Sequence, residues 1–364
     1  MSRPTTITVD LQAIKANCSF AQSLAENTKV MAVIKADAYG HGAIAIAHAL
    51  ASQIELFTVS CLEEALNLRS QGIKTPILLL EGCFSQLELI AAANNALQVV
   101  IHNHQQLTQL VEANISVPLT VWLKIDSGMH RLGISGNDCM AFYQKLRQVA
   151  NVKNIVLMTH LASADQPQNT MTDRQLTYFK HSIEKTLKLY PQTQQSIANS
   201  AALMAWPQSH ADWARPGIML YGISPFAQPH HNETYLVPAM TFSSKVIALR
   251  QIDSGEAVGY GNTWVAAQPS VIATVAVGYG DGYPRGARNG TPVLVNGQRA
   301  QLAGRVSMDM ISLDVTQIDG VNIGDDVELW GKKLPVNEVA KWADTIGYEL
   351  VTRMPTRARR IYTD

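Results

Sequence analysis

Cysteine is scarce in this chain, and neither sign of charge is in excess. Four cysteines occur in 364 residues, scattered without C-x-x-C pairs or neighbouring histidines. That spacing argues against a disulfide framework and against a structural zinc site. Lysine and arginine together number 29, as do aspartate and glutamate, so the chain has no basic field for nucleic acid and no acidic tail. We therefore expect a small-molecule partner and no nucleic acid.

Long hydrophobic runs are also missing. No apolar stretch approaches the roughly eighteen residues of a membrane-spanning helix. The opening residues lack a charged leader followed by an apolar segment. We expect a cytoplasmic protein with no membrane partner. The histidines of His102-Asn103-His104 and His230-His231 have no carboxylate or cysteine at ligand spacing, so we expect no metal site.

The chain has instead a repeated alternation of strand and helix patterns. Short apolar runs typical of buried strands alternate with helical segments from Val30 onward. Eight such strands are predicted, at residues 30–34, 56–60, 76–81, 98–101, 119–125, 155–160, 196–199 and 213–220. Eight strand–helix units in about 200 residues favour a (β/α)8 barrel over an open doubly wound sheet.

A second domain is predicted after residue 230. Between Pro225 and Pro238 the composition changes to proline, histidine, asparagine and glutamine, which indicates a linker. Short strands follow, and Asn296-Gly297 between two apolar segments is typical of a hairpin turn. The predicted fold class is α/β, with an N-terminal TIM-like (β/α)8 barrel at 10–230 and a C-terminal mostly-β domain at 231–364. Residues 1–9 are a candidate addition to the second domain.

The stretch Val30 to Gly42 delivers one lysine from the end of an apolar strand. A lysine beside an apolar strand loses hydration, which favours the neutral amine. A neutral amine can attack an aldehyde, so Lys35 is a candidate for covalent cofactor binding. The alternative is a surface lysine whose charged end reaches water from a strand terminus.

Other polar residues follow the same rule of position. In a TIM-like barrel, active groups come from the carboxyl ends of the strands. The residues placed there by the strand prediction are Lys35, Lys124, Asp126, His160, Asn199 and Ser200, and Arg215 lies within the eighth predicted strand. A phosphate site on this fold commonly uses the loops after strands seven and eight, where Ser200 and Gly217 occur. Taken singly, Ser200 could cap the next helix and Gly217 could form a bend.

These residues resemble the bacterial alanine racemase family, which uses pyridoxal 5′-phosphate (PLP). The stretch from Ala32 to Gly42 resembles the family's cofactor-lysine signature. Further ordered motifs resemble it along nearly the whole chain: Lys124-Ile125-Asp126-Ser127-Gly128-Met129-His130-Arg131-Leu132-Gly133, Trp213-Ala214-Arg215-Pro216-Gly217, Val258-Gly259-Tyr260-Gly261 and Gly304-Arg305-Val306-Ser307-Met308-Asp309.

The resemblance implies roles for cofactor and substrate residues. Lys35 would hold PLP and act as a base on one face of the substrate carbon. The phosphate would be bound by Tyr39, Ser200, Gly217 and Ile218. Arg131 would contact the cofactor's phenolic oxygen and the substrate, His160 would contact Arg215, and Lys124 resembles a position that is carbamylated in some members.

Arg215 and Tyr260 carry the implied chemistry. An arginine cannot accept a hydrogen bond, so at the pyridine nitrogen Arg215 would keep that nitrogen unprotonated and the carbanion short-lived, which suits returning the proton. Tyr260 would be the second base. In the family this tyrosine and the carboxylate-binding Met308 come from the partner subunit, which implies a homodimer with shared sites. The implied access channel consists of Asp165, Tyr279, Arg285 and Arg305. Thr356 stands where some relatives have a tyrosine that touches the phosphate.

The resemblance implies an isomerase that interconverts L-alanine and D-alanine and supplies D-alanine for peptidoglycan. Three alternatives remain at this stage. A barrel amino-acid decarboxylase would share the architecture, but it is disfavoured by Arg215 in place of an acid. A racemase of wider amino-acid specificity is the second. A non-catalytic PLP carrier is the third, and the second domain with Tyr260 argues against it.

Overall fold

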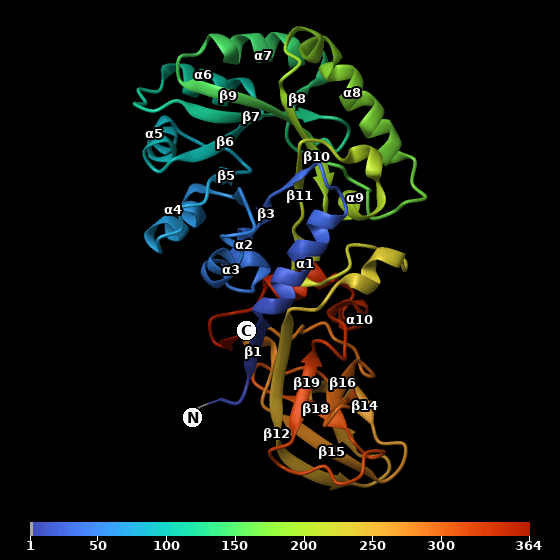
Figure 1. The fold of residues 1–364 in the computed structure, drawn as a ribbon. Coiled ribbons are helices and arrows are strands. Elements are labelled where there is room, and N and C mark those ends of the chain that lie inside the picture. Colours follow the sequence, from blue (N-terminus) through green and yellow to red (C-terminus); the bar gives the residue numbers. More distant parts are fainter. Residues whose placement is uncertain (1–2) are drawn as a thin grey trace.

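The computed structural model describes residues 3–364 and consists of a barrel half and a β half joined end to end (Figure 1). The barrel strands are β2 (Lys29–Val30), β3 (Ala32–Val33), β4 (Phe57–Val59), β5 (Ile77–Leu79), β6 (Leu97–Ile101), β7 (Leu119–Asp126), β9 (Val152–Met158), β10 (Gln194–Asn199) and β11 (Trp213–Arg215). A short strand, β8 (Ile134–Ser135), pairs only with β7.

The first strand closes the barrel. β2 and β3 are one chain segment interrupted at Met31, with β2 paired to β11 and β3 to β4. The Met31 N–H donates to the Ala214 carbonyl across 3.0 Å, and the Ala32 N–H donates to the Leu56 carbonyl across 3.1 Å. The segment therefore bonds to neighbours on both sides, and the predicted barrel of eight strand positions is confirmed.

Helices follow these strands, most of them on the outside of the barrel, whereas α2 is a left-handed turn at the end of β3 (Figure 1). They are α1 (Leu11–Ser23), α2 (Lys35–Tyr39), α3 (Ala43–Leu50), α4 (Leu62–Ser70), α5 (Gln86–Asn94), α6 (His104–Glu112), α7 (Cys139–Gln148), α8 (Met171–Leu189) and α9 (Ser200–Ala205). The eighth strand was predicted too long. It ends at Arg215 because Pro216 lacks an N–H for the ladder, and Ile218–Tyr221 forms a 3₁₀ helix instead.

Large side chains pack inside the barrel. A cluster separate from the main core contains Met31, Leu56, Leu78, Val100, Trp122, Val156, Met158 and Trp213. The rings of Trp122 and Trp213 meet edge to face with centroids 5.9 Å apart. Trp213 begins β11, and Trp122 lies in the middle of β7. On this fold a ligand site is expected at the carboxyl ends of the strands.

The β half is an eight-stranded sheet. Its strands are β1 (Thr6–Asp10), β12 (Met240–Ile252), β15 (Ser270–Val275), β16 (Pro292–Val295), β17 (Gln298–Leu302), β18 (Ile311–Asp314), β19 (Asp326–Trp330) and β20 (Arg359–Thr363). A separate ribbon joins β13 (Ala257–Val258) to β14 (Trp264–Val265), and two helices, α10 (Val336–Trp342) and α11 (Gly347–Thr352), face the barrel. The hairpin predicted at Asn296-Gly297 is confirmed, with φ of 50° and 79°.

The two ends of the chain meet in this sheet. β1 pairs with β12 and, in parallel, with the last strand β20. Asp10 then caps α1 by accepting from the Ala13 N–H across 2.9 Å. Residues 1 and 2, part of the segment predicted to join the second domain, lie outside the described residues. The β half is thereby tied to the first barrel helix.

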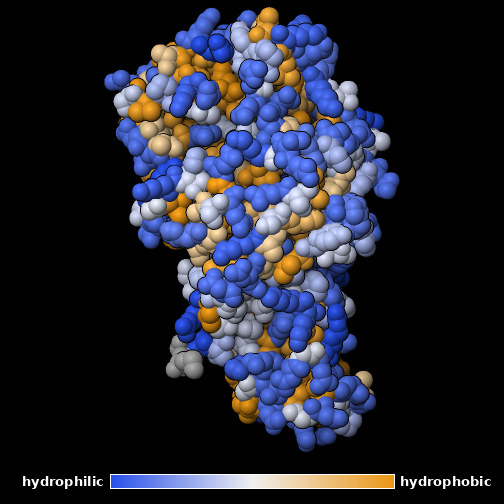
Figure 2. Space-filling model, viewed as in Figure 1, coloured by the Kyte–Doolittle hydropathy of each residue, from blue (hydrophilic) through white to orange (hydrophobic). Residues whose placement is uncertain are grey.

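Hydrophilic residues cover most of the face seen in Figure 2, and hydrophobic residues appear in separate groups over both halves. None of the helices formed by residues 3–364 has the length and apolar character needed to cross a membrane.

Candidate active site

A cavity of about 1570 Å³ opens at the carboxyl ends of the barrel strands and extends between the barrel and the β half. Eleven residues singled out from the sequence line it: Lys35, Tyr39, Lys124, Arg131, His160, Asp165, Asn199, Ser200, Arg215, Gly217 and Ile218. The barrel thus brings together residues up to 183 positions apart, counted from Lys35 to Ile218.

Lys35 is followed by a left-handed helical turn. Ala36, Asp37, Ala38 and Tyr39 all have positive φ, between 51° and 54°, and Gly40 continues at 77°. Each non-glycine residue in this conformation costs about 1–2 kcal/mol relative to a right-handed one. Four in succession are therefore a strained element that surrounding contacts must hold. The turn fixes where the Tyr39 ring lies relative to Lys35.

The Lys35 amine lies among other cations. Burial lowers its pKa, and Arg131 lowers it further, against smaller opposing effects of Glu81 and Glu64. A lower pKa increases the fraction of neutral amine near neutral pH, which is the form that attacks a carbonyl carbon. The environment therefore favours a nucleophilic Lys35.

Arg215 is buried, and its guanidinium meets only neutral acceptors. Nη1 donates to Ser196 Oγ across 2.5 Å, and Nη2 donates to the carbonyls of Thr159 and Ile197 at 2.5 and 3.1 Å. Burial lowers its pKa to about 10, so it stays charged at neutral pH. Nη2 also lies 3.4 Å from His160 Nδ1. The contact between Arg215 and His160 that the family pattern implies is present.

Lys124 is 8% exposed and lies in the same cationic group. Burial lowers its pKa to about 8, and Arg215, Arg131 and Lys35 act in the same direction. Among the described residues, none of these four cations forms a salt bridge. The group thus carries positive charge without a carboxylate partner, an arrangement that suits an anionic ligand or modification.

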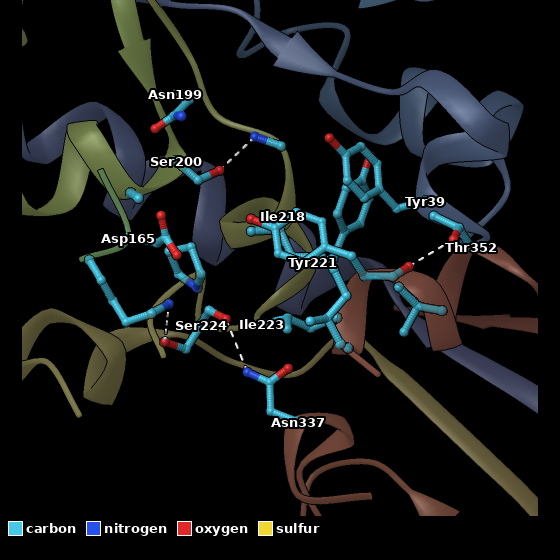
Figure 3. Close-up of a pocket in the computed structure, with 18 of the residues that line it drawn as sticks. Tyr39, Asp165, Asn199, Ser200, Ile218, Tyr221, Ile223, Ser224, Asn337 and Thr352 are labelled. Carbon is cyan, nitrogen blue, oxygen red and sulfur yellow. Dashed lines mark hydrogen bonds between the residues drawn. The ribbon is translucent and has the colours of Figure 1, made fainter. Parts of the chain in front are cut away.

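Polar groups that suit a phosphate converge around Gly217. Ser200 Oγ accepts from the Gly217 N–H across 2.8 Å, and Figure 3 shows this bond beside Ile218. A Cβ on Gly217 would lie 2.5 Å from the Tyr39 hydroxyl, so only glycine permits this close approach. The Tyr39 hydroxyl makes no hydrogen bond with residues 3–364. It is available to a ligand.

A tyrosine from the β half also reaches the cavity, and the sequence reasoning missed it. Tyr348 on α11 lines the cavity with its ring centroid 6.2 Å from that of Tyr39. Burial raises the pKa of Tyr348, so its hydroxyl stays protonated. Thr356, by contrast, is exposed and lies outside the lining.

A second group of predicted residues lies on the β half, away from the barrel cavity. Tyr260, Met308 and Tyr279 are 70%, 52% and 42% exposed, and Arg285 and Arg305 are exposed as well. None of the five lines the cavity. Within one chain the structure therefore brings together the barrel residues but not Tyr260 and Met308.

Backbone contacts nevertheless join most of the second group into one patch. The Tyr279 N–H donates to the Ser307 carbonyl across 3.0 Å, and the Gly280 N–H donates to the Met308 carbonyl across 2.9 Å. The Arg305 side chain approaches Gly261, the neighbour of Tyr260. The residues 258–262, 279–280 and 305–308, here called the Tyr260 patch, form this surface.

A buried carboxylate supports the patch from beneath. Asp281 is fully buried and accepts from Arg3 at 2.6 and 3.0 Å and from Arg357 at 3.1 Å. Arg3 also donates to the Asp309 carbonyl, and Arg357 pairs with the Asp309 side chain. Sequence reasoning missed this network because its members come from both ends of the chain. It fixes the loop that carries Met308.

Comparisons with known proteins agree with this arrangement. The family model described as alanine racemase, N-terminal domain, matches residues 9–225, and that described as alanine racemase, C-terminal domain, matches 239–362. The chain is 55% identical to an alanine racemase of Pseudoalteromonas atlantica, over 100% of this chain and 99% of the relative.

Solved structures give the same picture. The biosynthetic alanine racemase of Pseudomonas aeruginosa superposes with a TM-score of 0.94 at 45% identity, covering both chains completely. That of Bartonella henselae, solved with covalently bound pyridoxal phosphate, gives a TM-score of 0.89 at 30% identity, covering 99% of each chain. This chain belongs to the alanine racemase family.

Proposed function

We propose that this protein is a PLP-dependent alanine racemase, an isomerase that interconverts L-alanine and D-alanine. The observation that carries the proposal is the buried, carboxylate-free Arg215 in the cavity that also contains Lys35. The full-length similarity to alanine racemases supports the same activity. D-alanine supply for peptidoglycan is the role that family membership implies.

The cavity fits PLP in charge and in shape. Ser200, the Tyr39 hydroxyl and the side-chain-free Gly217 suit a phosphate, with Ile218 and Tyr348 beside them. Arg131 and Arg215 can only donate, which suits a phenolic oxygen and an unprotonated ring nitrogen. We assign these residues and Lys35 to PLP. When bound, PLP supplies an electron sink for the electrons of the Cα–H bond.

Lys35 and Tyr260 are the proposed catalytic residues. Inverting a stereocentre requires that a proton leave one face of Cα and return on the other. In each direction one of the two side chains takes the α-proton and the other gives one back. Lys35 serves the face toward the barrel. Tyr260 serves the opposite face, with the backbone at Met308 and the Arg131 side chain binding the substrate carboxylate.

Tyr260 acts, in this proposal, in the cavity of a second copy of the chain. Its high exposure and its absence from its own chain's cavity support this assignment. In a dimer with a two-fold axis, the Tyr260 patch of each chain would lie at the cavity of the other chain. The homodimer would then contain two composite sites. Asp165 of one chain with Tyr279, Arg285 and Arg305 of the other would form the access channel.

Arg215 favours racemisation over competing PLP chemistry. PLP-dependent decarboxylases and transaminases usually place a carboxylic acid beside the pyridine nitrogen, which keeps that nitrogen protonated. Arg215 stays charged and cannot accept a hydrogen bond, so beside it the ring nitrogen would stay unprotonated and PLP would be a weaker electron sink, which suits return of the proton to Cα. This feature disfavours the decarboxylase alternative. A non-catalytic carrier would have no use for the Tyr260 patch.

Lys124 is a proposed carbamylation site. A neutral amine adds to carbon dioxide and loses a proton, which leaves a carbamate with a negative charge. The lowered pKa provides the neutral amine, and Arg131 and Arg215 would stabilise the product. The carbamate would then orient Arg131.

We also propose the division of the chain at residue 230, with 10–230 as the barrel and 231–364 as the β-rich domain. The pairing of β1 with β12 and β20 supports the assignment of the amino-terminal strand to the second domain.

Chiral chromatography tests the activity. Purified, PLP-loaded protein is incubated with L-alanine and, in parallel, with L-serine, L-lysine and L-arginine. We expect D-alanine to form much faster than any other D-isomer. Comparable rates for several amino acids would favour the racemase of wider specificity, and release of amine and carbon dioxide without inversion would favour the decarboxylase.

A further inference from the structure

His41 lies at the end of the left-handed turn and is completely buried. Its Nδ1 atom lies 2.9 Å from the Tyr39 carbonyl oxygen and 3.2 Å from that of Ala38. Carbonyl oxygens only accept hydrogen bonds, so Nδ1 must carry the proton and donate to both. The neutral ring therefore has its hydrogen on Nδ1.

The rest of the ring makes contacts that an apolar ring would also make. It stacks on Tyr221 with centroids 4.5 Å apart, and Tyr221 in turn lies 5.0 Å from Tyr39. Nε2 is buried without a partner among the described residues. Burial lowers the pKa of His41 to about 4, so the ring is neutral at neutral pH. The distinctive contribution of histidine here is the Nδ1–H donor.

Other contacts fasten the turn at different points. The Ala36 N–H donates to Glu64 across 2.6 Å, the Ala43 N–H donates to Asp37 across 2.8 Å, and Arg360 donates to the Gly40 carbonyl across 3.0 Å. Only His41 among the described side chains donates to the Tyr39 carbonyl. The backbone position of Tyr39, whose hydroxyl we assign to the phosphate, therefore depends on the hydrogen bond from His41.

We propose that His41 is a positioning residue that holds the left-handed conformation of Ala38 and Tyr39 through Nδ1, and so places the Tyr39 hydroxyl and the Lys35 amine for PLP. This inference rests on the proposed PLP-dependent function. It assigns no direct contact between His41 and the cofactor or substrate. Its effect passes through the backbone of the turn.

Three substitutions separate the donor from the ring. In His41→Asn the side-chain amide nitrogen can reach the place of Nδ1, whereas in His41→Gln it reaches toward the place of Nε2. His41→Phe keeps the ring and removes the donor. Each full-length variant is stripped of PLP, PLP is titrated back while the absorbance of the lysine-bound cofactor is followed, and thermal unfolding of the stripped protein is measured separately.

We expect His41→Asn to bind PLP within a few-fold of the wild type, and His41→Gln and His41→Phe to bind about tenfold or more weakly, as the loss of a buried hydrogen bond implies. At saturating PLP, the kcat of His41→Gln should fall while its KM for alanine changes little. The PLP-free Asn and Gln variants should unfold at similar temperatures.

Equal PLP affinity of the Asn and Gln variants would overturn the proposal. So would a Gln variant that fails to fold while the Asn variant folds, because the bonds would then serve general stability. Wild-type protein that binds PLP but does not racemise alanine would contradict only the proposed activity. The PLP affinities of the variants would still test the role of His41.

Discussion

Arg215 Nη2 lies 3.4 Å from His160 Nδ1. Arg215 ends β11 and His160 follows β9, the two strands on either side of β10. Arginine only donates, so Nδ1 must accept and the imidazole must be neutral with its hydrogen on Nε2. Burial, and then the charge of Arg215, hold the pKa of His160 well below its usual range. Of these two residues, only Arg215 therefore carries a positive charge.

Replacing Arg215 with lysine should damage both the fold and the rate. A lysine ammonium lacks the planar guanidinium that donates to Ser196, Thr159 and Ile197 together. Each buried acceptor left without a donor costs about 1–3 kcal/mol of stability. We expect kcat to fall about 10- to 100-fold. The free energy of unfolding should fall by about 1–3 kcal/mol. Urea unfolding and steady-state kinetics measure both, with Arg250→Lys on the exposed part of β12 as the control. Unchanged kinetics would show that Arg215 has no role in catalysis.

Lys35→Ala should abolish the absorbance of lysine-bound PLP. It should also reduce racemisation by at least about 10⁴-fold, because both the covalent anchor and one base are lost. Lys29→Ala is a matched control, since Lys29 lies on the same chain segment but pairs with Glu55 at the surface. Turnover that persists with PLP in Lys35→Ala would mean that another lysine holds the cofactor.

Tyr260→Phe should stop racemisation without stopping one-sided proton exchange. Loss of one acid–base group typically lowers the rate by about 10²- to 10⁴-fold. In deuterium oxide, Lys35 should still exchange the α-proton on its own face, which NMR of recovered alanine detects. Tyr235→Phe, also at an exposed tyrosine, should behave like the wild type. Equal loss of racemisation and of all exchange would argue against separate bases.

Lys124 should make stability depend on pH. Its pKa falls from 10.5 to about 8 on folding, so between these values the unfolded chain binds more protons than the folded chain. Stability therefore rises with pH across this window, and the burial penalty is fully present only below about pH 8.

Denaturation in carbon dioxide-free buffer can measure this effect. The free energy of unfolding of the wild type, minus that of Lys124→Met, should increase by up to about 2 kcal/mol from pH 7 to pH 9.5. Bicarbonate should suppress the increase if Lys124 becomes a carbamate, because a carbamate no longer titrates as an amine. A constant difference without bicarbonate would contradict the lowered pKa.

The sequence predicted the barrel because its strands are separated by clear helical patterns and turn signals. Strand position predicted Lys35, Lys124, His160, Asn199 and Ser200 as cavity residues, whereas Tyr39, Arg131 and Asp165 came only from the family resemblance. The end of β11 was missed although Pro216 is visible, because the apolar residues beyond it continue the strand pattern.

Other features depend on tertiary packing. Nothing in Ala36 to Tyr39 favours positive φ, and only Gly40 and Gly42 hint at a turn. The turn is held by contacts with Glu64, Asp37 and Arg360 and, in our proposal, with His41. Tyr348 reaches the cavity only because α11 packs over the barrel mouth. Its ring cannot be placed there from local sequence.

Mixing two inactive variants tests the central claim most directly, that Lys35 and Tyr260 of different chains form one site. Lys35→Ala and Tyr260→Phe proteins carrying different affinity tags are exchanged, and mixed dimers are purified on both tags. Each mixed dimer has one intact site, so random exchange should restore about a quarter of wild-type activity to the mixture. Purified mixed dimers as inactive as their parents would contradict the shared site.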